Sequence, residues 1–273
     1  AGELSVSGSA SLNYSGLSTS SDANPYTMGN SVTFSGGGDL DNGMNVAVSY
    51  ELDDDVMDDY SLTLDMADMG VFKYGESVSG SGIDIASNMV PAVDTAIYSA
   101  VGTDTVSYGV ARSAQDTGNL GYKLALDGGI TVSVEAARNT SAGGTDNTYG
   151  VTYTGVENMT LVYGQSDINP GNQAGGSDET VMGIKYSVAG ATLAYMITDV
   201  DLGGVGAADE EGTHMGVSFA VNDDVTVSYG VQEVDITGKG EDETNSGFGI
   251  SYTMGSMSVA AYAGKTENGN GVS

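Results

Sequence analysis

The sequence predicts an all-β fold: a 16-stranded antiparallel transmembrane β-barrel whose last strand is truncated at the end of the chain. Three observations support this prediction. Apolar and small polar residues alternate along many segments, a two-strand unit repeats, and aromatic residues fringe the apolar face. Because alternate residues of a strand point to opposite faces of a sheet, each segment has one apolar face and one hydroxyl-rich face.

The first predicted strand, residues 4–14, carries this alternation in the segment LSVSGSASLNY. Its even positions are apolar or Tyr14, apart from Gly8, and its odd positions are Ser or Asn13. The outer face of a soluble β protein normally carries Lys, Arg and Glu. Here only 16% of residues are charged, and the polar faces are mostly Ser, Thr and Gly. The polar face therefore suits the lining of a watery pore, and the apolar face suits contact with lipid.

The second half of the chain repeats a two-strand unit every 33 residues. Its signature is Gly, then Val or Ile, then any residue, then an aromatic, and it begins at Gly150, Gly183, Gly216 and Gly249. The first strand of each unit ends in a short turn, and the second ends in a longer acidic, Gly-rich segment. Short turns that alternate with long loops predict an up-and-down antiparallel meander.

The same pattern extends backwards and predicts fifteen strands in all. They are expected at residues 4–14, 30–38, 44–52, 59–66, 70–75, 119–126, 129–137, 147–154, 158–166, 179–188, 191–199, 212–221, 224–234, 245–254 and 257–264. The last three residues, Gly271-Val272-Ser273, begin another copy of the repeated signature. We therefore expect a sixteenth strand to start there, because bacterial membrane barrels have an even number of strands.

Aromatic residues on the apolar face are expected to form two girdles, one at each membrane interface. Tyr suits an interface because its ring is apolar and its tip is polar. One series lies just before the short turns, and the other is expected near the long loops. The predicted girdle residues are Tyr14, Tyr50, Tyr153, Tyr163, Tyr186, Tyr195, Phe219, Tyr229 and Tyr252.

The charge balance restricts the possible partners. Acidic residues outnumber basic ones 37 to 7, which gives a formal charge of −30. Nucleic acid is not an expected partner, because binding phosphates requires a basic patch. The chain has no Cys and one His, so a disulfide framework or a thiolate metal site is not expected. It also lacks a nucleophile elbow and a phosphate-binding loop, and we predict no enzymatic activity.

The segment from Met69 to Ala100, MGVFKYGESVSGSGIDIASNMVPAVDTAIYSA, resembles the junction between a strand and the third loop of Gram-negative general porins, especially those of alphaproteobacteria. The start, ELSVSGSASLNYSG, is similar to a mature porin N-terminus and suggests that a signal peptide has been removed. The resemblance implies a homotrimer of 16-stranded barrels, with a long third loop folded into each pore. We therefore expect one outer-membrane barrel domain over residues 1–273, with residues 76–118 as an inserted constriction loop.

Opposed charges on the loop and on the barrel wall are expected to set the ion preference of the pore. The wall candidates are Lys73, Lys123 and Lys185, and the loop candidates are Glu76, Asp84, Asp94, Asp104, Arg112 and Asp116. Three further acids point inward by strand parity: Glu51, Asp65 and Glu135. The acids outnumber the bases, so we predict a preference for cations. Two features depart from the family pattern: the chain ends in Ser273 instead of an aromatic residue, and Arg residues are scarce.

The segment ELDDDVMDDY, residues 51–60, places many carboxylates around the second predicted long loop. Dense carboxylates can bind Ca²⁺, although the spacing is not that of an EF-hand. The possible calcium ligands are Asp53, Asp54, Asp55, Asp58 and Asp59. The alternative is an acidic outer loop that contacts a neighbouring subunit. Apart from this possible Ca²⁺, no cofactor is expected.

These features predict a passive diffusion channel in the outer membrane of a Gram-negative bacterium. It would pass small hydrophilic solutes and ions, and it would contact the lipid bilayer and lipopolysaccharide. One alternative is a substrate-specific channel or an adhesin-like barrel whose loops carry the function. Another is a soluble, acidic, Ca²⁺-binding β-repeat protein, but the nonapeptide Gly/Asp repeats typical of that class are absent from the sequence.

Overall fold

The computed structural model describes residues 3–14, 25–53, 56–76, 78, 80–93, 118–138, 144–169, 176–204, 208–238 and 240–268. In these residues, fifteen strands form one sheet in which each strand pairs with its neighbours in chain order. The strands are β1 (Glu3–Tyr14), β2 (Tyr26–Asp39), β3 (Asn45–Asp53), β4 (Val56–Asp65), β5 (Val71–Gly75), β6 (Asn119–Leu126), β7 (Ile130–Arg138), β8 (Thr145–Tyr153), β9 (Met159–Ile168), β10 (Ser177–Val188), β11 (Ala191–Leu202), β12 (Glu210–Ala220), β13 (Val225–Ile236), β14 (Glu243–Met254) and β15 (Met257–Glu267). Two short 3-10 helices, η1 (Ala67–Met69) and η2 (Gly82–Ala86), accompany them.

The predicted all-β meander is confirmed, and all fifteen predicted strands are present. The largest boundary difference is at β2, which begins at Tyr26 because its apolar alternation continues outward through Met28 to pair with β1. The predicted sixteenth strand falls on residues 271–273, outside the described residues. Within the described residues β1 and β15 are the two edges of the sheet, so closure into a sixteen-stranded barrel stays a prediction.

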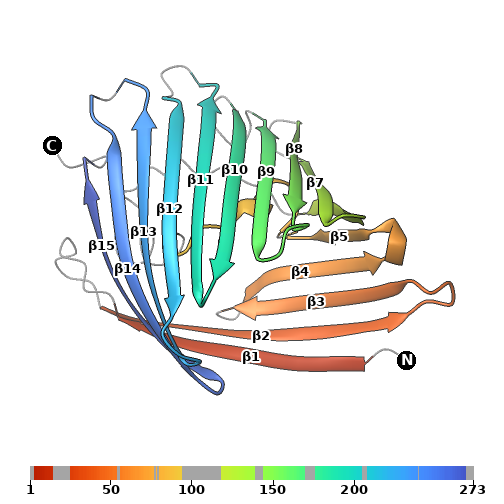
Figure 1. The fold of residues 1–273 in the computed structure, drawn as a ribbon. Coiled ribbons are helices and arrows are strands. Elements are labelled where there is room, and N and C mark those ends of the chain that lie inside the picture. The colour runs from red at the N-terminus through yellow and green to blue at the C-terminus, as the bar shows by residue number, and fades with distance from the viewer. Residues whose placement is uncertain are drawn as a thin grey trace.

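The sheet curves strongly, and the segment that carries η2 lies on its concave side (Figure 1). Strands β6 to β15 contain between 8 and 12 residues, close to the roughly 9–11 residues with which a strand crosses a bilayer. No helix among the described residues is long and apolar enough to cross a membrane.

The register confirms that the apolar face points outward. Ile184 pairs with Leu161 and Tyr195 on the neighbouring strands, and all three side chains lie on the outer face. Large apolar side chains there remain well exposed, for example Leu193 at 50% and Leu12 at 75%. A water-soluble surface seldom exposes so large a contiguous apolar area. The outer face is therefore suited to lipid.

The nine predicted girdle residues lie on the outer face, but one series is not where it was expected. The Tyr residues of β9, β11 and β13 lie at nearly the same level as the aromatics that precede the short turns. Tyr195, for example, pairs with Ile184, which is only two residues before Tyr186, and Tyr163 and Tyr229 pair in the same way. The prediction that this series lies near the long loops is therefore wrong for β9, β11 and β13. These strands continue well beyond their Tyr, and their outermost outward positions carry Asp or Glu. Tyr14 and Tyr50 do lie toward the loop ends of β1 and β3.

The second outer connection is also shorter than expected. Asp53 at the end of β3 pairs with Val56 at the start of β4, so only residues 54 and 55 join the two strands. The acidic run is therefore mostly part of a β-hairpin, and the prediction of a long second loop is wrong. A bulge next to Glu51 leaves Asp58 without a partner in the ladder, and this local irregularity lets the strands pair through the acidic stretch.

Candidate functional site

The described part of the third loop, residues 78 and 80–93, crosses the inner face of the sheet. We call it the third-loop segment. It follows β5 and contains η2, whose residues contact β7, β8, β9 and β10. Four residues in it, Gly80, Gly82, Asn88 and Ala92, have a left-handed backbone, which lets the chain turn along the wall.

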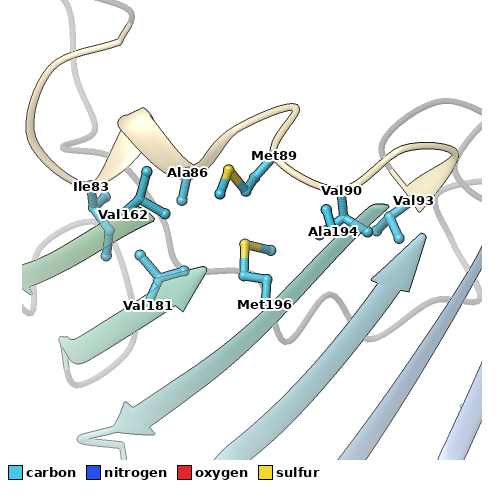
Figure 2. Close-up of a cluster of buried hydrophobic side chains, with 9 residues drawn as sticks. All are labelled: Ile83, Ala86, Met89, Val90, Val93, Val162, Val181, Ala194 and Met196. Atoms are coloured by element: carbon cyan, nitrogen blue, oxygen red, sulfur yellow. The ribbon is translucent and has the colours of Figure 1, made fainter. Parts of the chain in front are cut away.

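Apolar side chains seat this segment on the wall. Ile83, Ala86, Met89, Val90 and Val93 point from the segment toward the sheet (Figure 2). They meet a patch on β9 to β11, formed by Val162, Val181, Ala194 and Met196. Ile83 and Met89 are 1% and 2% exposed, and burial of side chains of this size contributes about 1.5–3 kcal/mol each. The hydrophobic core thus lies between the loop and the barrel wall.

Hydrogen bonds fix the start of the segment. The backbone N–H of Ile83 donates to Thr148 Oγ1 on β8 at 3.2 Å. The backbone N–H of Gly80 donates to Asp84 Oδ2 within the segment. On the wall beneath, Asn119 Nδ2 donates to Glu135 Oε1 at 3.0 Å, and both side chains are buried. The segment is therefore held by polar contacts at η2 and by apolar contacts beyond it.

Four of the predicted charged residues gather around this start. Lys73 on β5, Lys123 on β6 and Glu135 on β7 all face inward, and Asp84 lies in η2. Glu135 experiences the charges of both Asp84 and Lys73. A methyl group placed on Gly80 would lie 3.5 Å from Lys123 Nζ, so this ammonium group is next to the loop. Two wall lysines therefore lie on the inner face near the start of the segment that carries Asp84, and a charged constriction formed by these residues stays a prediction.

The other candidates lie elsewhere. Lys185 faces inward on β10. It is the next inward residue after Gly183 toward the short turn, and Met89 of the third-loop segment packs next to Gly183. Glu51 faces inward on β3 opposite Asp59, and Glu76 lies just after β5, where its backbone N–H donates to the Tyr60 carbonyl. Asp65 ends β4, and its Oδ1 accepts the backbone N–H of Ala67 in the turn. Asp94, Asp104, Arg112 and Asp116 lie outside the described residues.

The possible calcium ligands are only partly described. Asp54 and Asp55 lie outside the described residues, which include no group of three or more His, Asp or Glu side chains arranged to hold a metal ion. Asp53 and Asp59 face inward, and one buried carboxylate oxygen of each has no hydrogen-bond partner. Calcium binding at this hairpin stays a prediction.

The sequence reasoning missed the residues that seat the loop. Val162, Val181 and Met196 occupy inward positions that were expected to be polar. A signal was present: apolar residues interrupt the Ser and Thr pattern of the inner face on three adjacent strands. Asn119 and Thr148, which bind Glu135 and the loop backbone, carried no such signal because polar residues are common on that face.

Comparisons with known proteins identify the family and the fold. A family model described as Gram-negative porin matches residues 1–271. The anion-selective porin from Comamonas acidovorans is similar with a TM-score of 0.69 at 15% identity, over 99% of this chain and 91% of that one. The trimer form of OmpT from Vibrio cholerae gives 0.68 at 15%, over 98% and 89%.

A mutant of Rh. blastica porin gives a TM-score of 0.66 at 14% identity, over 95% of this chain and 93% of that one. At such identities these structures establish a shared fold. No curated protein matches the sequence.

Proposed function

This chain belongs to the Gram-negative porin family, and from that premise we propose that it is a passive diffusion channel for small hydrophilic solutes and ions, with a preference for cations. The protein is located in the outer membrane, as the family is. The observation that carries the preference is the excess of inward-facing carboxylates over inward-facing lysines. The third-loop segment would narrow the channel, and solutes would pass between it and the rest of the wall.

The acids on β3 and β4 support this preference most directly. Glu51 and Asp59 are directly opposite each other on the inner face, and Asp53 is the next inward residue. One carboxylate oxygen of Asp53 and one of Asp59 have no hydrogen-bond partner, so no protein donor offsets the negative charge at these two atoms. A wall with this charge attracts cations into a narrow aqueous path.

The lysines do not outweigh these acids. Lys73 acts on Glu135 through its charge, as Asp84 does, and Lys123 Nζ lies next to Gly80, whose backbone N–H donates to Asp84, so acids lie close to both lysines. In the described residues, the inner wall and the third-loop segment set three lysines against at least ten acids. The lysines are Lys73, Lys123 and Lys185, and the acids are Glu51, Asp53, Asp59, Asp65, Asp84, Glu135, Asp146, Glu179, Glu210 and Glu243. One structural neighbour is named as anion-selective, and we expect the opposite preference here.

Planar-bilayer recordings in a KCl gradient test the preference. The reversal potential of the wild-type channel is expected to have the sign of a cation-preferring pore. Replacing both acids, with Glu51→Gln and Asp59→Asn, should lower the ratio of K⁺ to Cl⁻ permeability. For an ion about 10 Å away in water, each unit charge changes local ion concentration by about twofold.

Asp68→Asn is the matched control, because Asp68 is exposed in η1 at the short-turn end, away from the third-loop segment. It removes a carboxylate with little expected effect on the reversal potential. An anion-biased reversal potential in the wild-type protein would contradict the proposed preference.

We also propose that the channel assembles as a homotrimer in contact with lipopolysaccharide. The support is the family membership and the similarity to a neighbour described in a trimer form. Light scattering of the detergent-purified protein should give three chains per particle, and conductance should appear in triplets of equal steps. A stable single-chain particle with single steps would refute the trimer.

A substrate-specific channel or an adhesin-like barrel is the alternative function. A specific channel would saturate with one solute at low concentration, whereas a general one should show flux that rises linearly and falls with solute size. An adhesin-like barrel would give no solute flux. Absence of enzymatic activity also stays a prediction.

A further inference from the structure

The third-loop segment lies on glycines of the barrel wall. Six inward-facing positions on six different strands are glycine where the segment passes: Gly121, Gly150, Gly164, Gly183, Gly216 and Gly230. We call this set the glycine track. We propose that the track fixes the depth and height of the third-loop segment in the channel and thereby determines the width of the path for solutes. This inference rests on the proposed function as a channel.

The contacts show how closely loop and wall approach. A methyl group added at Gly164 would lie 2.9 Å from Ile83 Cγ1, and one at Gly230 would lie 3.0 Å from the Pro91 carbonyl oxygen. Methyl groups at Gly150 and Gly216 would overlap the carbonyl oxygens of Gly82 and Pro91, respectively. Glycine in a strand interior weakens the strand and is typical of sites where another backbone approaches closely.

The track advances regularly across the sheet. Gly150 and Gly164 pair directly, as do Gly216 and Gly230. Gly164 pairs with Val181 on β10, and Gly183 lies two residues further along that strand. Gly183 in turn pairs with Met196 on β11, and Gly216 pairs with Ala194, which lies two residues further along β11 in the same direction across the sheet. Each step is one inward position nearer the short turns. The glycines therefore follow the path of the segment and not a single row of the ladder.

The track also accounts for the repeat in the sequence. Gly150, Gly183 and Gly216 open three of the four copies of the 33-residue signature, and all three lie under the third-loop segment. In the fourth copy, the three atoms nearest to a methyl group at Gly249 belong to Ser228 and Tyr262. The same sequence position thus occurs with and without the loop above it, which supplies an internal control.

The contacts predict a graded response to Gly→Ala substitution. At Gly150 and Gly216 the added methyl group meets the loop backbone, which must move away from the wall and into the channel. At Gly183 it meets the side chains of Val162 and Met89 at 3.0 and 3.3 Å, and Met89 can change its rotamer. Single-channel conductance should therefore fall clearly in Gly216→Ala and Gly150→Ala, and least in Gly183→Ala.

A distance measurement tests loop position independently of conductance. The chain has no Cys, so spin labels on Ser87→Cys and Ser49→Cys form a unique pair between an exposed residue of the segment and the inner wall of β3. The label-to-label distance should shift in Gly216→Ala and stay unchanged in Gly249→Ala. Heat-dependent electrophoretic mobility establishes that each variant has folded, and Gly183→Ala serves if the other variants fail to fold.

A second-site change gives a readout that a general loss of stability would not produce. Gly183→Leu should shift the label distance and lower the conductance, and adding Met89→Ala should restore both by vacating the space that the new side chain needs. An unshifted label distance in Gly216→Ala, or an equal conductance loss in Gly249→Ala, overturns the inference. A shifted distance in a protein that never conducts, wild type included, refutes the channel function and leaves the positioning role of the track supported.

Discussion

A buried hydrogen bond beneath the loop gives a prediction about single residues. Asn119 Nδ2 donates to Glu135 Oε1 at 3.0 Å, and each residue is only 4% exposed. Removing the donor leaves a buried carboxylate with one partner fewer. Hydrogen bonds to charged groups contribute about 1.5–3 kcal/mol. We expect Asn119→Ala to lower the free energy of unfolding by about that amount in a urea titration of the detergent-solubilised protein.

Asn45→Ala is the matched control for this prediction. Asn45 Nδ2 also donates to a carboxylate, Asp39 Oδ1, at 3.0 Å, but this pair is exposed at a short turn. Its loss should change the free energy of unfolding by about 0.5 kcal/mol or less. An equal decrease in the free energy of unfolding in the two variants would show that the buried hydrogen bond contributes no more to stability than the exposed one.

Strand parity predicts which face a residue occupies, but it does not predict which residues meet across the interior. It placed Lys73, Lys123 and Glu135 on the inner face correctly. The approach of Asp84 to them depends on where a loop of about forty residues returns to the wall, and no local pattern encodes that path. The alternation also did not reveal the apolar patch on which the loop packs, because the residues of that patch occupy inward positions expected to carry Ser or Thr.

The β3–β4 hairpin gives a prediction about one element. If the acidic run binds Ca²⁺ as its composition suggests, saturating Ca²⁺ should raise the unfolding temperature. Linkage gives about 2.7 kcal/mol when the free ion is at 100 times its dissociation constant. The double variant Asp53→Asn and Asp59→Asn should abolish the shift, measured against EDTA at matched ionic strength.

The double variant Asp223→Asn and Asp224→Asn is the control for calcium binding. It removes two adjacent carboxylates from the short turn between β12 and β13, at the opposite end of the barrel. The calcium shift should survive in it. If calcium has no effect on the wild-type protein, or an equal effect on both double variants, the hairpin is not a calcium site.

The strands themselves could be predicted well because their signal is local. Alternation and turn residues act over two to four positions, and they located all fifteen strands. The β3–β4 connection was misjudged because Asp is rare in strands, so the acidic run suggested a loop. Pairing with β2, where Ser31 meets Asp53, overrides that propensity and extends β3 by one residue.

For the whole molecule, the orientation of the sheet in the membrane is testable with tryptophan. The natural chain contains none, so Tyr229→Trp and Tyr262→Trp are single reporters. Tyr229 lies on the outer face, whereas Tyr262 pairs with Gly249 and lies on the inner face. Brominated acyl chains should quench the first reporter, and aqueous iodide should quench the second.

The reverse pattern of quenching would mean that the hydroxyl-rich face meets the outside and that the apolar face encloses the interior. Quenching of both reporters by iodide, with the protein free in plain buffer, would favour the soluble β-repeat alternative. Either result would also remove the basis for a channel.

The stepwise advance of the repeated glycines has a geometric consequence. Gly150, Gly183 and Gly216 lie on β8, β10 and β12, and each lies two residues further along the ladder than the one before. An advance of one residue per strand, with a rise of about 3.4 Å and a strand spacing of about 4.8 Å, corresponds to a tilt of about 35°. Closed barrels tilt their strands by roughly 35–45°. The 33-residue period therefore sets the shear, which is the stagger between strands on closure of the barrel. Sixteen strands with this advance would return to the first strand with a stagger of about sixteen residues.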